Sequence, residues 1–146
     1  MDSLIIEKKL DSLQRCLNRI AEKCPATAEA LEHDLDLQDV IVLNLSRAVQ
    51  LCVDIGAHCL STSSAPPPNT MGETFERLAQ TGLIDNELAG KMKKSVGFRN
   101  LAVHNYSELN IQIVHAIASR HLKDFRQFAQ SIAQATATID RPGQYS

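Results

Sequence analysis

The feature that most constrains this sequence is a series of apolar residues at helical spacing between residues 36 and 60. Apolar side chains recur there at steps of three and four, and additional valines and leucines widen the apolar arc beyond one stripe. Asp36 opens the segment. A helix that is apolar over most of its circumference is usually central in a bundle. The segment therefore predicts a long helix that other helices surround.

Four further segments show the same helical spacing of apolar residues. They span residues 4–24, 71–80, 85–106 and 110–138. Thr27 is suited to cap a short turn through about residue 33. The sequence contains no alternating strand pattern and no hairpin dipeptide. We therefore expect an all-α fold, an antiparallel up-and-down bundle of four main helices plus one short helix.

The chain length suits a single domain, so we expect one bundle over residues 1–146. Residues 61–70 include three consecutive prolines, which stop a helix and favour an extended loop. Arg141-Pro142-Gly143 ends the last predicted helix. A loose tail is expected over about residues 140–146.

The charge balance argues against a broadly basic protein that coats DNA. The formal net charge is -2, whereas tight binding along a nucleic-acid backbone needs many cations. A small basic cleft on a mildly acidic surface remains compatible with this value. The first residues lack the layout of a signal peptide, and no stretch approaches the ~20 apolar residues of a membrane span. We therefore expect a cytoplasmic protein without a membrane segment.

The four cysteines, at positions 16, 24, 52 and 59, do not form a metal-binding pattern. No pair has CxxC spacing and no pair of histidines completes a zinc pattern. All four fall in predicted helices, which favours buried, reduced thiols that act as small hydrophobes. We expect no metal and no cofactor.

Arg99 stands on an apolar stripe of the predicted helix over residues 85–106. It follows Leu88 by eleven residues, and at about 100° per residue eleven steps return to within roughly 20° of the start. Val103 and Tyr106 continue the same stripe. Arginine keeps its charge, so it must be paired, or face a cleft or another subunit. A cation at this position is therefore a candidate for function.

His104 follows Arg99 by five residues, about 140° round the helix, and shares its face with Asn100. The long arginine side chain and the imidazole can converge on one phosphate, more easily if two copies of the helix meet at a dimer axis. Arginine binds phosphate oxygens as a fork, and a histidine pKa near ~6.5 suits proton transfer. RNA supplies its own nucleophile, the 2′-hydroxyl. A structural arginine and a helix-end histidine are the alternative.

Asp54 is the next candidate, because it lies in the middle of the most apolar helix. A buried carboxylate needs a partner, which Arg99 or His104 would supply across the bundle. The alternative is a pair with His58, one turn later, facing solvent. A cluster of lysines also precedes Arg99, and it either steers RNA or forms an ordinary solvated face. Its members are Lys91, Lys93 and Lys94.

The segment Phe98-Arg99-Asn100-Leu101-Ala102-Val103-His104-Asn105-Tyr106 matches the signature R-x4-H-x-Y, with an apolar residue before the arginine and an asparagine after it. Its lead-in Gly82-Leu83-Ile84-Asp85 agrees as well. So do Leu37-Gln38-Asp39 and Val53-Asp54-Ile55-Gly56-Ala57-His58 of the central helix. With these segments the chain resembles the HepT-like family, a branch of the HEPN superfamily, over nearly its whole length.

The resemblance implies a helical homodimer in which pairs of arginine and histidine line a cleft between protomers. It also implies an RNA-cleaving toxin whose partner is an MNT-type nucleotidyltransferase antitoxin that adenylylates the signature tyrosine, here Tyr106. The expected function is a metal-independent ribonuclease toxin of a type VII-like toxin–antitoxin system. The alternatives are a catalytically silent HEPN module that binds nucleotide or RNA, and a dimeric adaptor for a nucleotidyltransferase.

On this hypothesis Arg99 binds and stabilises the scissile phosphate, and His104 is the general base or acid. Asn100 orients the phosphate or His104, or it caps a neighbouring backbone group. Asp54 is a further orienting residue. Tyr106 is both a contact and the modification site, and it can also pack at the dimer interface.

Overall fold

The computed structural model describes residues 3–64 and 66–139, and this part of the chain is helical without strands. The expected loose tail lies outside the described residues. The elements are α1 (Ser3–Lys23), α2 (Ala28–Glu32), α3 (Leu35–Leu60), α4 (Met71–Gln80), α5 (Asn86–His104), the 3-10 turn η1 (Tyr106–Glu108), α6 (Ile111–Arg120) and α7 (Leu122–Ile139).

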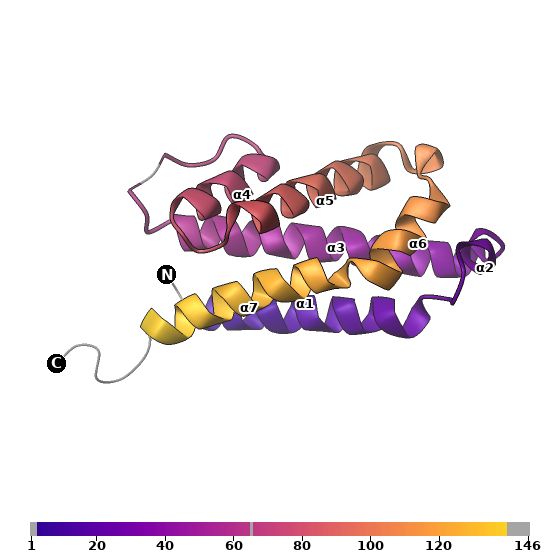
Figure 1. The fold of residues 1–146 in the computed structure, drawn as a ribbon, viewed down its shortest axis with the longest axis horizontal. Coiled ribbons are helices and arrows are strands. Elements are labelled where there is room, and N and C mark those ends of the chain that lie inside the picture. Colours follow the sequence, from indigo (N-terminus) through magenta and orange to yellow (C-terminus); the bar gives the residue numbers. More distant parts are fainter. Residues whose placement is uncertain (1–2, 65, 140–146) are drawn as a thin grey trace.

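The four longest helices, α1, α3, α5 and α7, run alternately up and down the long axis of the molecule (Figure 1). This arrangement confirms the predicted antiparallel bundle. The remaining helices are short: α4 and α6 have ten residues each and α2 has five. α4 coincides with the short helix predicted over residues 71–80. Residues 61–64 and 66–70 connect α3 to α4 without helix or strand.

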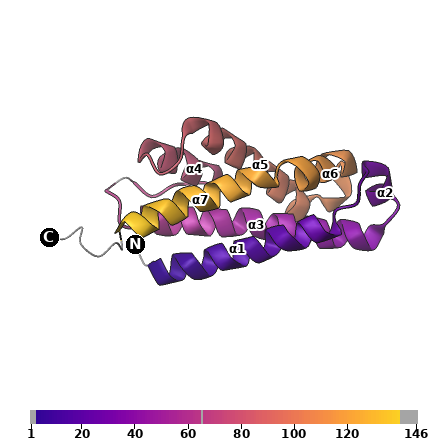
Figure 2. The same cartoon turned by 60° about the horizontal axis from the view of Figure 1, so that its bottom comes forward.

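α3 is the central helix, and it contacts α1, α2, α4, α5, α6 and α7. In a second view α3 lies between α1 on one side and α7 and α5 on the other (Figure 2). By length and composition α3 could cross a membrane, which corrects the expectation that no stretch approaches this limit. However, 56% of its most apolar window is buried inside the bundle. This burial is what a core helix requires.

The predicted last helix over residues 110–138 is interrupted at His121. This residue has φ -114° and ψ 8°, and it separates α6 from α7. Buried residues continue at helical spacing through Ala118, Leu122 and Phe125, so the apolar pattern does not reveal the break. The interruption lets α6 pack on α2, while α7 packs on α5 and α1.

Side-chain caps fix where the helices begin. The Thr27 hydroxyl accepts a hydrogen bond from the Ala30 amide (3.1 Å), as predicted for the short turn. The cap of α3 is Asp34 rather than Asp36, since its carboxylate accepts from the Leu37 amide at 3.0 Å. Asp85 caps α5 and thereby sets the start of the helix that carries the signature.

All four cysteines are free thiols, but only two are buried as expected. Cys52 and Cys59 lie in the core, and burial raises the pKa of Cys59 to about 11. Cys16 and Cys24 are half-buried. The interpretation of small buried hydrophobes therefore holds for the two thiols of α3.

Candidate functional site

Arg99 lies where the buried stripe of α5 ends. Leu88, Met92 and Val96 are buried, whereas Arg99, the next position on the stripe, is half-exposed. Val103 was expected to continue the stripe, and this is wrong: 52% of its surface is exposed. The last turn of α5 is buried on another side. The core contacts of the stripe therefore stop just before the guanidinium.

In the described part of the chain no acidic side chain pairs with the Arg99 guanidinium. Its only described hydrogen bond runs from Nη1 to Asn100 Oδ1, at 3.2 Å. No ion pair of the described residues includes Arg99. Asn100 thus contacts the guanidinium from the neighbouring position, and no described acid pairs with this cation.

His104 is the last residue of α5 and is exposed to solvent. Asn105 closes the helix with φ -144° and ψ 55°, and its amide donates to the Leu101 carbonyl at 2.8 Å. Tyr106 then begins η1, so the helix ends two residues earlier than predicted. The structure thus places Arg99 and His104 in the C-terminal part of α5 and Tyr106 at the start of η1, which follows it.

Tyr106 is tied to α3 by a contact that the sequence did not predict. Its hydroxyl donates a 2.6 Å hydrogen bond to Asp39 Oδ1, although 42% of the residue surface is exposed. Burial, the hydrogen bond to Asp39 and the charge of that carboxylate raise the pKa of the Tyr106 phenol to about 12. The only sequence signal for Asp39 is its place in the segment Leu37-Gln38-Asp39. This segment supports the resemblance but predicts no role for Asp39 itself.

Asp54 lies apart from the signature. It lines a groove between α1 and α3 and accepts a hydrogen bond from Gln50 Nε2 at 2.9 Å. Within residues 3–64 and 66–139 no hydrogen bond or ion pair joins Asp54 to Arg99, His104 or His58. The structure therefore does not bring this carboxylate to the arginine and histidine that it was expected to orient.

The lysine cluster of α5 largely forms ion pairs. Lys93 pairs with Glu76, and Lys91 lies 3.5 Å from Glu87 and 3.8 Å from Asp124. These contacts favour the interpretation of a solvated charged face over RNA steering.

An apolar hollow of about 400 Å³ lies beside the signature, between α5 and α6. Phe98, Leu101 and Ile113 contribute to its walls, whereas Arg99 and His104 do not. Arg99 and His104 lie outside this hollow, the arginine half-exposed and the histidine exposed. Among the described residues no three His, Cys, Asp or Glu side chains gather closely enough to hold a metal ion.

The chemistry available at this end of α5 is phosphate binding by a free guanidinium and proton transfer by an exposed imidazole. The all-helical bundle with this signature defines a HEPN-type protein. The Ribonuclease HepT-like family model matches residues 13–132, and the chain belongs to this family.

The relatives include proteins that are named nucleases. The mRNA nuclease HepT of Shewanella oneidensis is 38% identical over 128 residues, which cover 88% of this chain and 96% of the relative. The tRNA nuclease HepT of Aphanizomenon flos-aquae is 24% identical, over 96% and 95% of the two chains. A solved structure of tri-AMPylated Shewanella oneidensis HEPN toxin in complex with MNT antitoxin has a TM-score of 0.83 and 38% identity, over 89% of this chain and 97% of that one.

Replacing Asp39 with Asn should lower the Tyr106 pKa from about 12 toward its ordinary value of 10, but not fully, since burial remains. Because folding raises the pKa of this phenol, the folded state favours its neutral form more than the unfolded state does. The resulting contribution to stability is fully present below pH 10 and is lost as the pH rises to about 12. Tyrosinate absorbance during a pH titration measures the shift. The chain has two tyrosines, so Tyr106→Phe identifies the titration of the other. An unchanged Tyr106 titration in Asp39→Asn would contradict the assigned contact.

Proposed function

We propose that this chain is a metal-independent endoribonuclease that acts as the toxin of a toxin–antitoxin pair. The observation that carries the proposal is the Arg99 guanidinium at the end of a buried stripe, which is half-exposed and has no acid partner among the described residues. His104 lies five residues later at the helix terminus. The nuclease names of the relatives support the same activity. We place the activity in the cytoplasm and in one domain over residues 1–146.

In the proposed reaction Arg99 binds the non-bridging oxygens of the scissile phosphate and stabilises their charge in the transition state. The 2′-oxygen attacks phosphorus and loses its proton to an imidazole, His104 acting as general base. The bond to the 5′-oxygen breaks, and that oxygen takes a proton from a general acid, for which a second His104 is available in a dimer. The products are a 2′,3′-cyclic phosphate and a 5′-hydroxyl.

The site requires a second copy of the chain to become a cleft. Arg99 and His104 of one chain lie on an open surface, and the neighbouring side chains Val103 and Tyr106 are large, apolar or aromatic, and exposed. Covering such a patch is favourable, by roughly 25 cal/mol for each Å² of apolar area removed from water. We infer a homodimer whose seam lies here and brings two pairs of arginine and histidine together.

The partner in this proposal is an MNT-type nucleotidyltransferase, because the related Shewanella toxin is described as tri-AMPylated in complex with its MNT antitoxin. Tyr106 is the acceptor, since its hydroxyl group lies on an exposed residue two positions after His104. An adenylyl group there adds bulk and negative charge beside the phosphate site, which would oppose RNA binding. The antitoxin thus neutralises the nuclease.

Purified protein should cleave RNA in the presence of EDTA. Arg99→Ala and His104→Ala should each lower the rate about a hundredfold or more, because each removes transition-state stabilisation or proton transfer. Arg126→Ala and His121→Ala are matched controls outside the signature and should keep wild-type rates. RNA binding without cleavage in the wild type would support the catalytically silent module instead. If the wild type neither binds nor cleaves RNA, the dimeric adaptor is the interpretation that remains.

Incubation with an MNT-type nucleotidyltransferase and ATP should add adenylyl groups to the wild-type chain and abolish its cleavage of RNA. The Tyr106→Phe variant should keep its nuclease rate after the same treatment, because it lacks the acceptor hydroxyl. Intact-protein mass spectrometry counts the adenylyl groups. Equal modification of wild type and Tyr106→Phe, or no modification of either, contradicts this assignment.

A further inference from the structure

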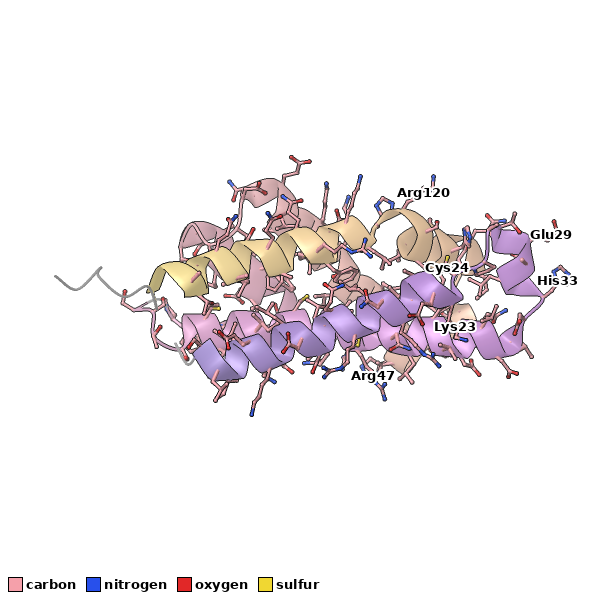
Figure 3. The ribbon with its side chains drawn as sticks, turned by 90° about the horizontal axis from the view of Figure 1, so that it is seen from below. Lys23, Cys24, Glu29, His33, Arg47 and Arg120 are labelled. Atoms are coloured by element: carbon pink, nitrogen blue, oxygen red, sulfur yellow. The ribbon has the colours of Figure 1, made fainter. Side chains whose placement is uncertain are left out.

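A second cationic surface lies in the groove between α1 and α3. The groove has a volume of about 720 Å³, and three arginines line it: Arg15, Arg19 and Arg47. The two helices are extensively packed along their length. Viewed from the side of α1, Arg47 lies at the edge where α1 and α3 run side by side (Figure 3).

The three arginines of this groove are exposed and are not neutralised by acids in the described part of the chain. Arg15 donates to the Ser12 hydroxyl at 3.0 Å, and no described ion pair includes any of the three. One carboxylate, Asp54, lines the groove and already accepts from Gln50. On a chain with a net charge of -2, three cations against one anion form a concentrated positive surface.

Two of the arginines, Arg15 and Arg47, lie close to one residue of the groove, Cys16. Burial raises the pKa of the Cys16 thiol, and the positive charges of Arg47 and Arg15 offset part of that rise, so both cations are close to this residue. The lining also includes the apolar side chains of Val40, Leu43 and Leu51, and Leu43 is half-exposed. Cations next to accessible apolar surface suit a strand with a charged backbone and apolar sugar and base surfaces.

The groove approaches the signature along α3, because its lining includes Val40, the residue next to Asp39. Asp39, Leu43 and Arg47 follow one another at steps of four, so they lie on one face of the helix. Asp39 is the residue that accepts the hydrogen bond from Tyr106. At 1.5 Å per residue, Asp39 and Arg47 are about 12 Å apart along α3, which a stacked strand spans with about three to four nucleotides.

We propose that the groove between α1 and α3 binds backbone phosphates of the RNA strand beside the scissile position, with Arg15, Arg19 and Arg47 as the phosphate ligands. This inference rests on the proposed nuclease function. Because the groove offers no aromatic side chain for stacking, its binding depends strongly on salt and weakly on sequence.

The test uses a short fluorescent 2′-O-methyl RNA, which lacks the attacking hydroxyl and therefore stays intact. Affinity is measured by anisotropy between about 50 and 200 mM salt. The variant Arg15→Ala/Arg19→Ala/Arg47→Ala should bind about tenfold more weakly, and the slope of log affinity against log salt should be smaller by about 2, for three lost contacts at roughly 0.7 each.

A matched control removes the same charge elsewhere, through Arg120→Ala, Lys123→Ala and Arg126→Ala. These three residues line another hollow, beside α6 and α7, and Arg120 lies at the opposite edge of the molecule from Arg47 (Figure 3). The control should keep the wild-type affinity to within about twofold and most of its salt slope. Equal losses of affinity in the two triple variants would show a non-specific charge effect and overturn the assignment of the groove as a phosphate-binding site.

The remaining outcomes separate the two proposals. If the wild type cleaves RNA but the groove variant binds like the wild type, the groove assignment fails and the nuclease stands. If the wild type neither binds nor cleaves RNA, both fail. Light scattering measures the molecular mass of each variant. A change of mass confined to the groove variant would assign the arginines to contact with a second copy and overturn their role as phosphate ligands.

Discussion

The burial of α3 is the constraint on which the rest of the structure depends. Apolar side chains cover most of its surface, so the free energy of the fold requires helices on nearly every side. α5 meets this requirement with a buried stripe that extends only to Val96. Its last two turns carry Arg99 and His104 past the end of that stripe. The packing of a central helix therefore decides where the charged side chains can remain exposed.

The free arginine links this packing to the proposed chemistry. Burying a guanidinium without an acid would be costly, and pairing it with an acid would neutralise the charge that a phosphate needs. The structure does neither, since Arg99 is half-exposed and bonded only to the neutral Asn100 amide among its described partners. Asp39 fixes Tyr106 nearby without contacting Arg99. The α1–α3 groove, whose lining on α3 begins at Val40 next to Asp39, holds three further arginines that we propose contact the RNA strand.

Most of the architecture was predictable from residue spacing, because burial follows the helical period. The break at His121 was not, since buried residues on both sides keep the spacing of one continuous helix. The end of the stripe at Arg99 was only half predictable: the arginine stood out, but the exposure of Val103 depends on which helices extend that far. The bond between Tyr106 and Asp39 joins residues 67 positions apart, and no local pattern encodes such a contact. Asp54 illustrates the converse, a mid-helix carboxylate that finds its partner one turn away in Gln50.

In the proposed reaction the RNA supplies the nucleophile, while the protein supplies one fixed cation and proton transfer. Analysis of the RNA termini tests it most directly. Cleavage by the wild-type protein in EDTA should leave 2′,3′-cyclic phosphate and 5′-hydroxyl ends, and a single 2′-deoxy substitution at the cleaved position should block the reaction. Fragments with 3′-hydroxyl and 5′-phosphate ends, or continued cleavage at the 2′-deoxy position, would contradict the account.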